Sequence, residues 1–176
     1  MLTDREKQYC ADISERFSSM RRFLSACELS EPVDPIQWHS FLSGFRKIQG
    51  NLNNDGSFVA TLLAKYYLSS KYDIEFDAAE KPQGAPGIDI QVETSNGTSI
   101  AAEIKTTVPY QATDFGAQQA ASFKKDFAKL TVSDATYKYL LVTDAHAFEV
   151  LQKDKYRKLM HGITVVNLVS GDEFAA

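Results

Sequence analysis

The hydrophobic pattern of the chain changes near Tyr72, and this change decides which elements the chain can form. Up to that residue, apolar side chains recur every three or four positions, which is the period of an amphipathic helix. Beyond it, apolar and polar side chains alternate over residues 88–93 and 99–107, which is the period of a half-buried strand. Asn96-Gly97 lies between these two stretches and predicts a tight hairpin. The sequence therefore predicts helices followed by a sheet.

Helix start signals precede each of five predicted helices. An N-cap side chain accepts a hydrogen bond from the first turn, so it marks where a helix begins. The predicted N-caps are Thr3, Asp34, Ser57, Asp114 and Asp144. The helices that they open are expected to run to about residues 24, 50, 70, 130 and 160, with a turn at 51–56 before the third.

Three more strands are expected outside the hairpin. Residues 74–76 continue the alternation, whereas 137–143 and 163–169 are mostly apolar, as is typical of buried strands. The element order is then α-α-α-β-β-β-α-β-α-β, which implies a mixed sheet with helices on its faces. We expect an α/β fold in which residues 1–50 form an N-terminal helical extension and residues 51–176 form the core, together as one compact domain.

Composition limits the cellular setting of the chain. Its 176 residues suit a domain of ordinary size. Its apolar runs are too short for a transmembrane helix, and its first twenty residues include no secretory signal pattern. Cys10 and Cys27 have neither metal-ligand spacing nor a disulfide pattern. We expect a cytoplasmic protein with no membrane contact.

Opposite charges are concentrated in different parts of the chain. Taken as a whole, the formal net charge of −4 argues against a nucleic-acid partner. However, residues 51–120 carry nine acidic and four basic side chains, whereas residues 121–160 carry eight basic and five acidic ones. This asymmetry is compatible with a metal or carboxylate site beside an anion-binding surface, and also with two solvated faces. The net charge therefore neither supports nor excludes DNA as a partner.

Charged side chains gather on one face of the predicted hairpin. Because side chains alternate along a strand, Asp89, Glu103 and Lys105 share one face, and the opposite face is apolar. Hard oxygen ligands at an open site favour Mg²⁺, which neutralises phosphate charge and acidifies a bound water. A lysine beside it can orient that water or stabilise the transition state. The trio suits metal-assisted hydrolysis of a phosphodiester, although a solvent-facing strand pair would have the same pattern. The apolar face comprises Ile88, Ile90, Val92, Ile100, Ala102 and Ile104.

The spacing of these residues resembles a nuclease signature. Pro86-Gly87-Ile88-Asp89, thirteen intervening residues and then Glu103-Ile104-Lys105 look like the motif of the PD-(D/E)XK nuclease superfamily, which includes restriction, recombination and repair nucleases. The core of that superfamily is α-β-β-β-α-β, the order predicted for residues 57–143. The proline stands three residues before Asp89 rather than next to it, and the predicted helix 58–70 contains no acidic residue.

The resemblance implies roles for individual residues. Asp89 and Glu103 would hold Mg²⁺, with Mn²⁺ able to substitute, and the backbone carbonyl of Ile104 would complete the site. Lys105 would be the catalytic lysine. Some members of the superfamily carry a functional glutamine on the following helix, which implies a catalytic role for Gln119. A surface glutamine that makes local hydrogen bonds is the alternative interpretation, and the number of metal ions, one or two, stays open.

Nucleic-acid contacts are expected beside the motif. Thr106, Thr107 and Tyr110 follow it directly and would touch DNA at the edge of a cleft, while Lys124 and Lys125 on the next helix would contact phosphates. A solvated basic face is the alternative for these lysines. On the same helix, one stripe is expected to face the sheet and another to lie nearly opposite; the opposite stripe comprises Gln118, Ser122, Lys125 and Lys129.

The resemblance implies a Mg²⁺-dependent DNA endonuclease of the restriction-endonuclease-like type. A two-fold homodimer of such an enzyme would match the pseudo-symmetry of duplex DNA. Two alternatives belong to other classes of protein. One is a non-catalytic DNA-binding or assembly subunit that retains the nuclease fold, and the other is an α/β interaction domain whose charged strand face lies in solvent.

Overall fold

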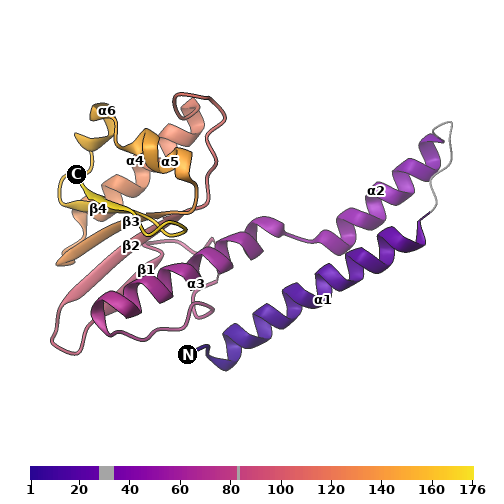
Figure 1. Cartoon of the computed structure of the whole chain (residues 1–176), viewed down its shortest axis with the longest axis horizontal. Helices are drawn as coiled ribbons and strands as arrows, with labels where there is room; N and C mark the ends of the chain where they lie inside the picture. The colour runs from indigo at the N-terminus through magenta and orange to yellow at the C-terminus, as the bar shows by residue number, and fades with distance from the viewer. Residues whose placement is uncertain (28–33, 83) are drawn as a thin grey trace. The chain divides into compact units, whose positions relative to one another are not determined.

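The computed structural model describes residues 1–27, 34–82 and 84–176 and divides the chain into two compact units, Met1–Asp55 and Gly56–Ala176 (Figure 1). None of the described helices combines the length and the apolarity that crossing a bilayer requires.

The unit Met1–Asp55 contains two helices that pack through aromatic rings. Helix α1 spans Asp4–Ala26, and helix α2 spans Pro35–Gln49. The predicted cap at Thr3 is confirmed, and Glu6 completes a capping box with it; the predicted Asp34 cap is confirmed as well, and its side chain accepts the N–H of Ile36. The rings of Phe23 on α1 and Phe41 on α2 stack with centroids 5.5 Å apart.

Helix α3, Leu52–Tyr72, begins earlier than the sequence predicts. The expected turn at 51–56 and the expected cap at Ser57 are both wrong. The side chain of Asn51 accepts the N–H of Asn54, and its carbonyl accepts the N–H of Asp55, so the helix starts there. Asp55 is buried and pairs with Arg16. A polar run that resembles a turn is helical because capping and an ion pair satisfy its first turn.

The unit Gly56–Ala176 is built on a sheet of five strands, and the predicted mixed pairing is confirmed. The strands occur in chain order across the sheet, with antiparallel pairs at both edges and parallel pairs between β2, β3 and β4. They are β1 Ile90–Glu93, β2 Ser99–Lys105, β3 Tyr137–Val142, β4 Ile163–Asn167 and β5 Glu173–Ala175. In chain order the elements of this unit read α3-β1-β2-α4-β3-α5-α6-β4-β5. The helices are α4 Ala117–Val132, α5 Ala145–Leu151 and α6 Asp154–Arg157.

Helices cover both faces of the sheet (Figure 1). On one face, Ala64 and Leu68 of α3 pack into a cluster with Ile90, Ile100 and Ala102. Leu140 and Val142 face the other way, into a cluster with Phe123 of α4 and Leu151 of α5. The apolar face predicted for the hairpin packs under α3, except for Ile88, which packs against the α4 cluster. Ile88 precedes the first strand residue and therefore escapes its alternation.

The strand expected at 74–76 does not form. Ile74 is buried and Phe76 packs beside it in the α3 cluster, but neither joins the sheet. Asp73, at φ +50°, turns the chain away from α3, and Asp77 closes a local turn by accepting the N–H groups of Ala79 and Glu80. The alternation correctly indicated burial, but Asp73 and Asp77 turn the chain on either side of residues 74–76, which do not join the sheet.

Two other elements differ from their predictions near the C-terminus. The single helix expected over 144–160 is divided into α5 and α6, with Gln152 and Lys153 between them. The strand expected over 163–169 ends at Asn167, whose side chain accepts the N–H of Val169. Together with Gly171 at φ +81°, this bond reverses the chain and allows β5, which the sequence analysis missed, to pair with β4.

Asp114 is not the cap of α4, contrary to the sequence prediction. The cap is Gly116, and the side chain of Gln119 accepts its N–H. The carboxylate of Asp114 instead pairs with Lys155 and accepts a 2.7 Å hydrogen bond from the Tyr156 hydroxyl. It therefore ties the loop before α4 to α6. These contacts, with Lys155 first, lower the pKa of Asp114 from 3.8 to about 2.

Replacement of Asp114 by Asn should weaken the fold most at neutral pH. A carboxylate whose pKa is lower in the folded chain contributes stability above the unfolded pKa and loses it as the pH falls from 3.8 towards 2. The difference in unfolding free energy between wild type and Asp114→Asn should therefore shrink as urea unfolding is measured at pH 7, 4 and 3. Exposed Asp134→Asn is the control, and an equal difference at all three pH values would contradict the prediction.

Candidate metal centre

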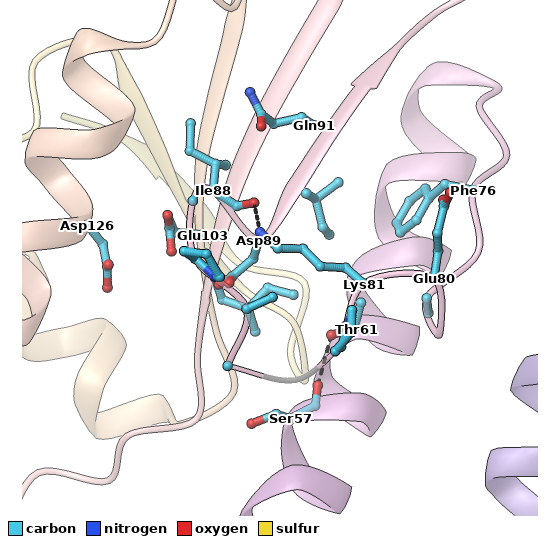
Figure 2. A pocket seen from close by; sticks show the side chains of 18 of the residues that line it. Ser57, Thr61, Phe76, Glu80, Lys81, Ile88, Asp89, Gln91, Glu103 and Asp126 are labelled. Atoms are coloured by element: carbon cyan, nitrogen blue, oxygen red, sulfur yellow. Dashed lines mark hydrogen bonds between the residues drawn. The ribbon is translucent and has the colours of Figure 1, made fainter.

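The predicted trio lies in a cleft of about 840 Å³ within the unit Gly56–Ala176 (Figure 2). Side chains of α3 and the loop before β1 form one side, and β2 with α4 forms the other. Asp89, Glu103 and Lys105 all line this cleft. The sequence therefore predicted correctly that the three residues come together.

Asp89 stands just before β1 and binds the backbone of β2. Its Oδ2 accepts the N–H of Ile104 at 2.9 Å. The ladder runs antiparallel from the pair Ile90–Ala102, so Asp89 reaches β2 where β1 begins. The carbonyl of Lys105 bonds to Thr143 on the β3 side, and adjacent carbonyls in a strand point in opposite directions. The carbonyl of Ile104 is thus directed towards Asp89.

Glu103 is a buried carboxylate beside a second carboxylate. Its residue is 2% exposed, and Figure 2 places it next to Asp89. Burial, followed by the negative charge of Asp89, raises the pKa of Glu103 from 4.5 to about 7, although a hydrogen bond from Lys129 opposes the shift. A cation near the carboxylates of Asp89 and Glu103 would relieve the repulsion between them.

Lys105 projects from β2 towards α4. Its Nζ donates to Ser122 Oγ at 2.8 Å and lies 2.5 Å from Asp126 Oδ2. The Phe123 ring lies near the same ammonium, with 5.7 Å between Nζ and the ring centroid. The interpretation of a charged strand face in solvent is therefore wrong for Glu103 and Lys105, since both pack beneath α4.

Two further charged residues of α4, which the sequence did not predict at the site, line the cleft. Asp126 is 4% exposed and lines the cleft, and Lys129 contacts both Asp126 and Glu103. Ser122 and Lys129 were expected nearly opposite the sheet, which is wrong. They flank the buried stripe, and their side chains reach over its edge to β2. An acidic residue among apolar stripe positions, such as Asp126 beside Phe127, was the available signal.

The loop before β1 is fixed against the same end of the cleft. Lys81 Nζ donates to the carbonyl of Ile88 at 2.5 Å, the contact drawn in Figure 2. Gly87 takes φ +95°, a conformation that side chains with a Cβ rarely adopt. Its carbonyl accepts a hydrogen bond from Lys129 at 3.3 Å. The Pro/Gly stretch of the motif thus turns the chain so that Asp89 enters the cleft.

The residues expected to contact DNA lie around the motif with varied exposure. Thr106 lines the cleft and is exposed, and Thr107 is half-buried. Tyr110 is 85% exposed on the loop that follows. Lys124 and Lys125 are exposed on α4. All five therefore offer polar atoms or a ring to solvent, while their role in binding stays a prediction.

Gln119 is nine-tenths buried and organises the loop before α4. Its Oε1 accepts the N–H groups of Tyr110 and Gly116, and its Nε2 donates to the carbonyl of Val108 at 2.7 Å. All three polar partners are backbone groups, and Gln119 is not among the described residues that line the cleft. Its contacts are those of a residue that holds a loop, and its catalytic role stays a prediction.

Truncation of Gln119 should destabilise the protein, whereas its neighbour should tolerate the same change. Gln119→Ala leaves three backbone groups near Val108, Tyr110 and Gly116 without their partner, which should cost about 1–3 kcal/mol of unfolding free energy. Gln118→Ala, on the exposed side of the same turn, should change stability by less than about 0.5 kcal/mol. Urea unfolding measures both, and equal effects would contradict the assignment.

The donor set at this cleft fits a hard divalent cation. Asp89 and Glu103 offer carboxylate oxygens in the cleft, and the Ile104 carbonyl points to the β1 side of β2, the side on which Asp89 lies. Within residues 1–27, 34–82 and 84–176, no three His, Cys, Asp or Glu side chains group as metal ligands. Mg²⁺ commonly takes one or two carboxylates and completes its shell with water and phosphate oxygens. Two carboxylates and a carbonyl therefore suit Mg²⁺ better than zinc.

Comparison with family models, curated proteins and solved structures finds no match to this chain.

Glu103 should make the metal-free protein less stable as the pH rises. The folded chain holds the Glu103 proton to a pH of about 7, against 4.5 for the ordinary side chain, so unfolding free energy falls across this interval. Glu103→Gln has no proton to lose, so its unfolding free energy should not decrease in this way. The difference in unfolding free energy between the variant and wild type should therefore shift by about 2–3 kcal/mol in favour of the variant between pH 4.5 and pH 8. Urea unfolding in EDTA tests this, with exposed Glu93→Gln as control; parallel pH profiles would contradict it.

Proposed function

We propose that the protein is a Mg²⁺-dependent DNA endonuclease related to the PD-(D/E)XK superfamily, of the restriction-endonuclease-like type. The observation that carries the proposal is the convergence of Asp89 and Glu103 in one cleft with Lys105 two positions along the same strand as Glu103. The Ile104 backbone between them is directed to the same end of the cleft. This is the arrangement of groups that metal-assisted phosphodiester hydrolysis needs.

The order of elements supports the proposal in part. The hairpin β1–β2, helix α4 and parallel strand β3 follow α3 in the order of the superfamily core. The core of the superfamily has one more strand after its first helix, where residues 74–76 of this chain are irregular. The proposal therefore rests on the motif and its cleft more than on the sheet.

Each residue of the candidate site has a defined role in the proposed reaction. Asp89, Glu103 and the Ile104 carbonyl would hold Mg²⁺, which supplies charge neutralisation for the phosphate and a more acidic attacking water. The Lys105 ammonium, held by Asp126 and Ser122, would orient that water and stabilise the negative charge of the transition state. An anchored ammonium loses little freedom on binding, which favours positioning.

The surface around the cleft suits contact with the nucleic-acid backbone. Thr106 carries a hydroxyl group at the cleft edge and half-buried Thr107 follows it, while Lys124 and Lys125 are exposed on α4. Such groups bind phosphates without regard to sequence, while exposed Tyr110 offers a ring that could stack or fill a groove. Two copies related by a two-fold axis would present two such sites to a duplex.

A non-catalytic DNA-binding or assembly subunit is the second candidate. It is favoured by the ion pairs within the site, since Lys105 pairs with Asp126 and Lys129 pairs with Glu103. In such a subunit these pairs would be structural, and DNA binding would be indifferent both to divalent cations and to the loss of Lys105.

Cleavage of DNA tests the proposal directly. A mixture of plasmids and high-molecular-weight genomic DNA, incubated with wild type and Mg²⁺, should be cut. Asp89→Ala and Lys105→Ala should each lower the rate by at least about 100-fold, since one removes a metal ligand and the other a transition-state contact. Glu93→Ala is the matched control, because Glu93 is an exposed carboxylate on β1, and it should retain the wild-type rate.

Cutting that persists in both Asp89→Ala and Lys105→Ala would contradict the assignment. Binding of DNA by wild type without any cutting, unchanged by EDTA and by Lys105→Ala, would instead identify the non-catalytic subunit.

A further inference from the structure

The ammonium of Lys129 is surrounded by oxygen atoms of the candidate metal centre. Its Nζ lies 3.0 Å from Glu103 Oε1, 3.1 Å from Asp126 Oδ1 and 3.3 Å from the carbonyl oxygen of Gly87. These three oxygens come from β2, α4 and the loop before β1. Such a set of oxygen donors from three elements is what a bound cation would use.

Burial favours a positive charge at this position. The side chains of Glu103 and Asp126 are 3% and 6% exposed, so their charges are largely withdrawn from water. Figure 2 shows the two carboxylates on opposite sides of the same space. Lys105 pairs with Asp126, but the cation in contact with Glu103 is Lys129. An ionised carboxylate that is buried without a partner is strongly destabilising, so the ionised form of Glu103 needs either Lys129 or another positive charge.

Lys129 is anchored less firmly than the oxygens that it contacts. Its side chain is 41% exposed and reaches the site from the surface of α4, whereas the Lys105 side chain is 17% exposed. A flexible lysine side chain can leave its partners and remain solvated. A divalent cation that binds Glu103 carries twice its charge and would take over its electrostatic function.

We propose that Lys129 is the internal counter-cation of this centre, which a divalent metal displaces from Glu103 so that the released ammonium can contact a DNA phosphate. The inference rests on the proposed function for its metal and its substrate. It assigns Lys129 as a positioning residue that contacts the carboxylates of Glu103 and Asp126 and keeps them in place when the metal is absent.

A purely structural salt bridge would predict the opposite response to mutation. If Lys129 only supported the architecture of the site, its loss would disorder the carboxylates and weaken metal binding. If it competes with the metal, its loss should strengthen metal binding, because the metal no longer has to displace an ammonium. The sign of the change in metal affinity therefore separates the two roles.

Calorimetric titration of wild type, Lys129→Met and Lys125→Met with Ca²⁺ in the absence of DNA measures this sign. Lys125→Met removes the same charge from the same helix but from an exposed lysine one turn away, so it reports the general electrostatic effect. Lys129→Met should bind Ca²⁺ about five- to tenfold more tightly than Lys125→Met. Equal or weaker binding by Lys129→Met would overturn the inference, as would the absence of Ca²⁺ binding in both variants.

Acetylation of the wild-type chain provides a measurement that needs no variant. With an N-hydroxysuccinimide ester and peptide mass spectrometry, Lys129 should react slowly without metal, since its ammonium is held by three oxygens. Saturating Ca²⁺ should raise its modification rate at least about threefold relative to Lys125 in the same sample. A Lys129 rate that is unchanged or lowered by Ca²⁺ would overturn the displacement.

The two proposals fail in different experiments. If Lys129→Met strengthens Ca²⁺ binding but the protein never cuts DNA, the proposed role of Lys129 is supported and the proposed nuclease activity is contradicted. If the protein cuts DNA through Asp89 and Lys105 but Lys129→Met leaves its Ca²⁺ affinity unchanged, the proposed nuclease activity is supported and the proposed role of Lys129 is contradicted.

Discussion

Two buried carboxylates between the sheet and one helix require positive charge, and the site depends on how that charge is supplied. Glu103 on β2 and Asp126 on α4 are both nearly inaccessible to water. Lys105 pairs with Asp126, and Lys129 contacts both acids, so the four side chains form one chain of ion pairs between the strand and the helix. Removal of one member would leave a buried charge uncompensated, which typically costs more than the pair contributes.

This ion-pair chain also determines how α4 lies on the sheet. Apolar contacts of Phe123, Phe127 and Leu130 attach the helix to the sheet, but such contacts are not directional. The contacts of Lys105 with Ser122 and Asp126 connect one strand position to successive turns of the helix. Directional contacts of this kind set the register of α4 against β2. The cleft therefore has a wall of fixed charges rather than a purely apolar one.

The third constraint is the backbone at the start of β1. Asp89 does not belong to the strand, and it enters the cleft because the chain turns at Gly87 and because its side chain binds the N–H of Ile104. Ile88 consequently packs beneath α4 rather than beneath α3. If β1 began at residue 88, strand alternation alone would have fixed the directions of the Ile88 and Asp89 side chains.

Local signals were sufficient for the hairpin and for the helices that begin at Thr3, Asp34 and Asp144, although not for the caps expected at Ser57 and Asp114. The period of two along 99–105 placed Glu103 and Lys105 on one face, and the Thr3 and Asp34 caps were read from residue type. The prediction failed where local hydrogen bonds compete. Residues 74–76 have the pattern of a strand, yet Asp77 closes a turn beside them. β5 was missed because its strand is short and its pairing depends on the reversal after Asn167.

The sequence by itself determined the mixed α/β architecture and the shared face of Glu103 and Lys105, since both follow from hydrophobic period and strand alternation. The position of Asp89 beside them depends on the turn at Gly87 and on its bond to the Ile104 N–H. Only the tertiary structure decided that Asp126 and Lys129 complete the site. Whether a residue at the flank of a helix stripe faces solvent or a neighbouring strand depends on the rotation of that helix about its axis. That rotation is set by long-range packing against the sheet, which local periodicity does not encode. The folded chain thus brings two lysines to two buried acids, and the surroundings of Glu103 follow from that juxtaposition.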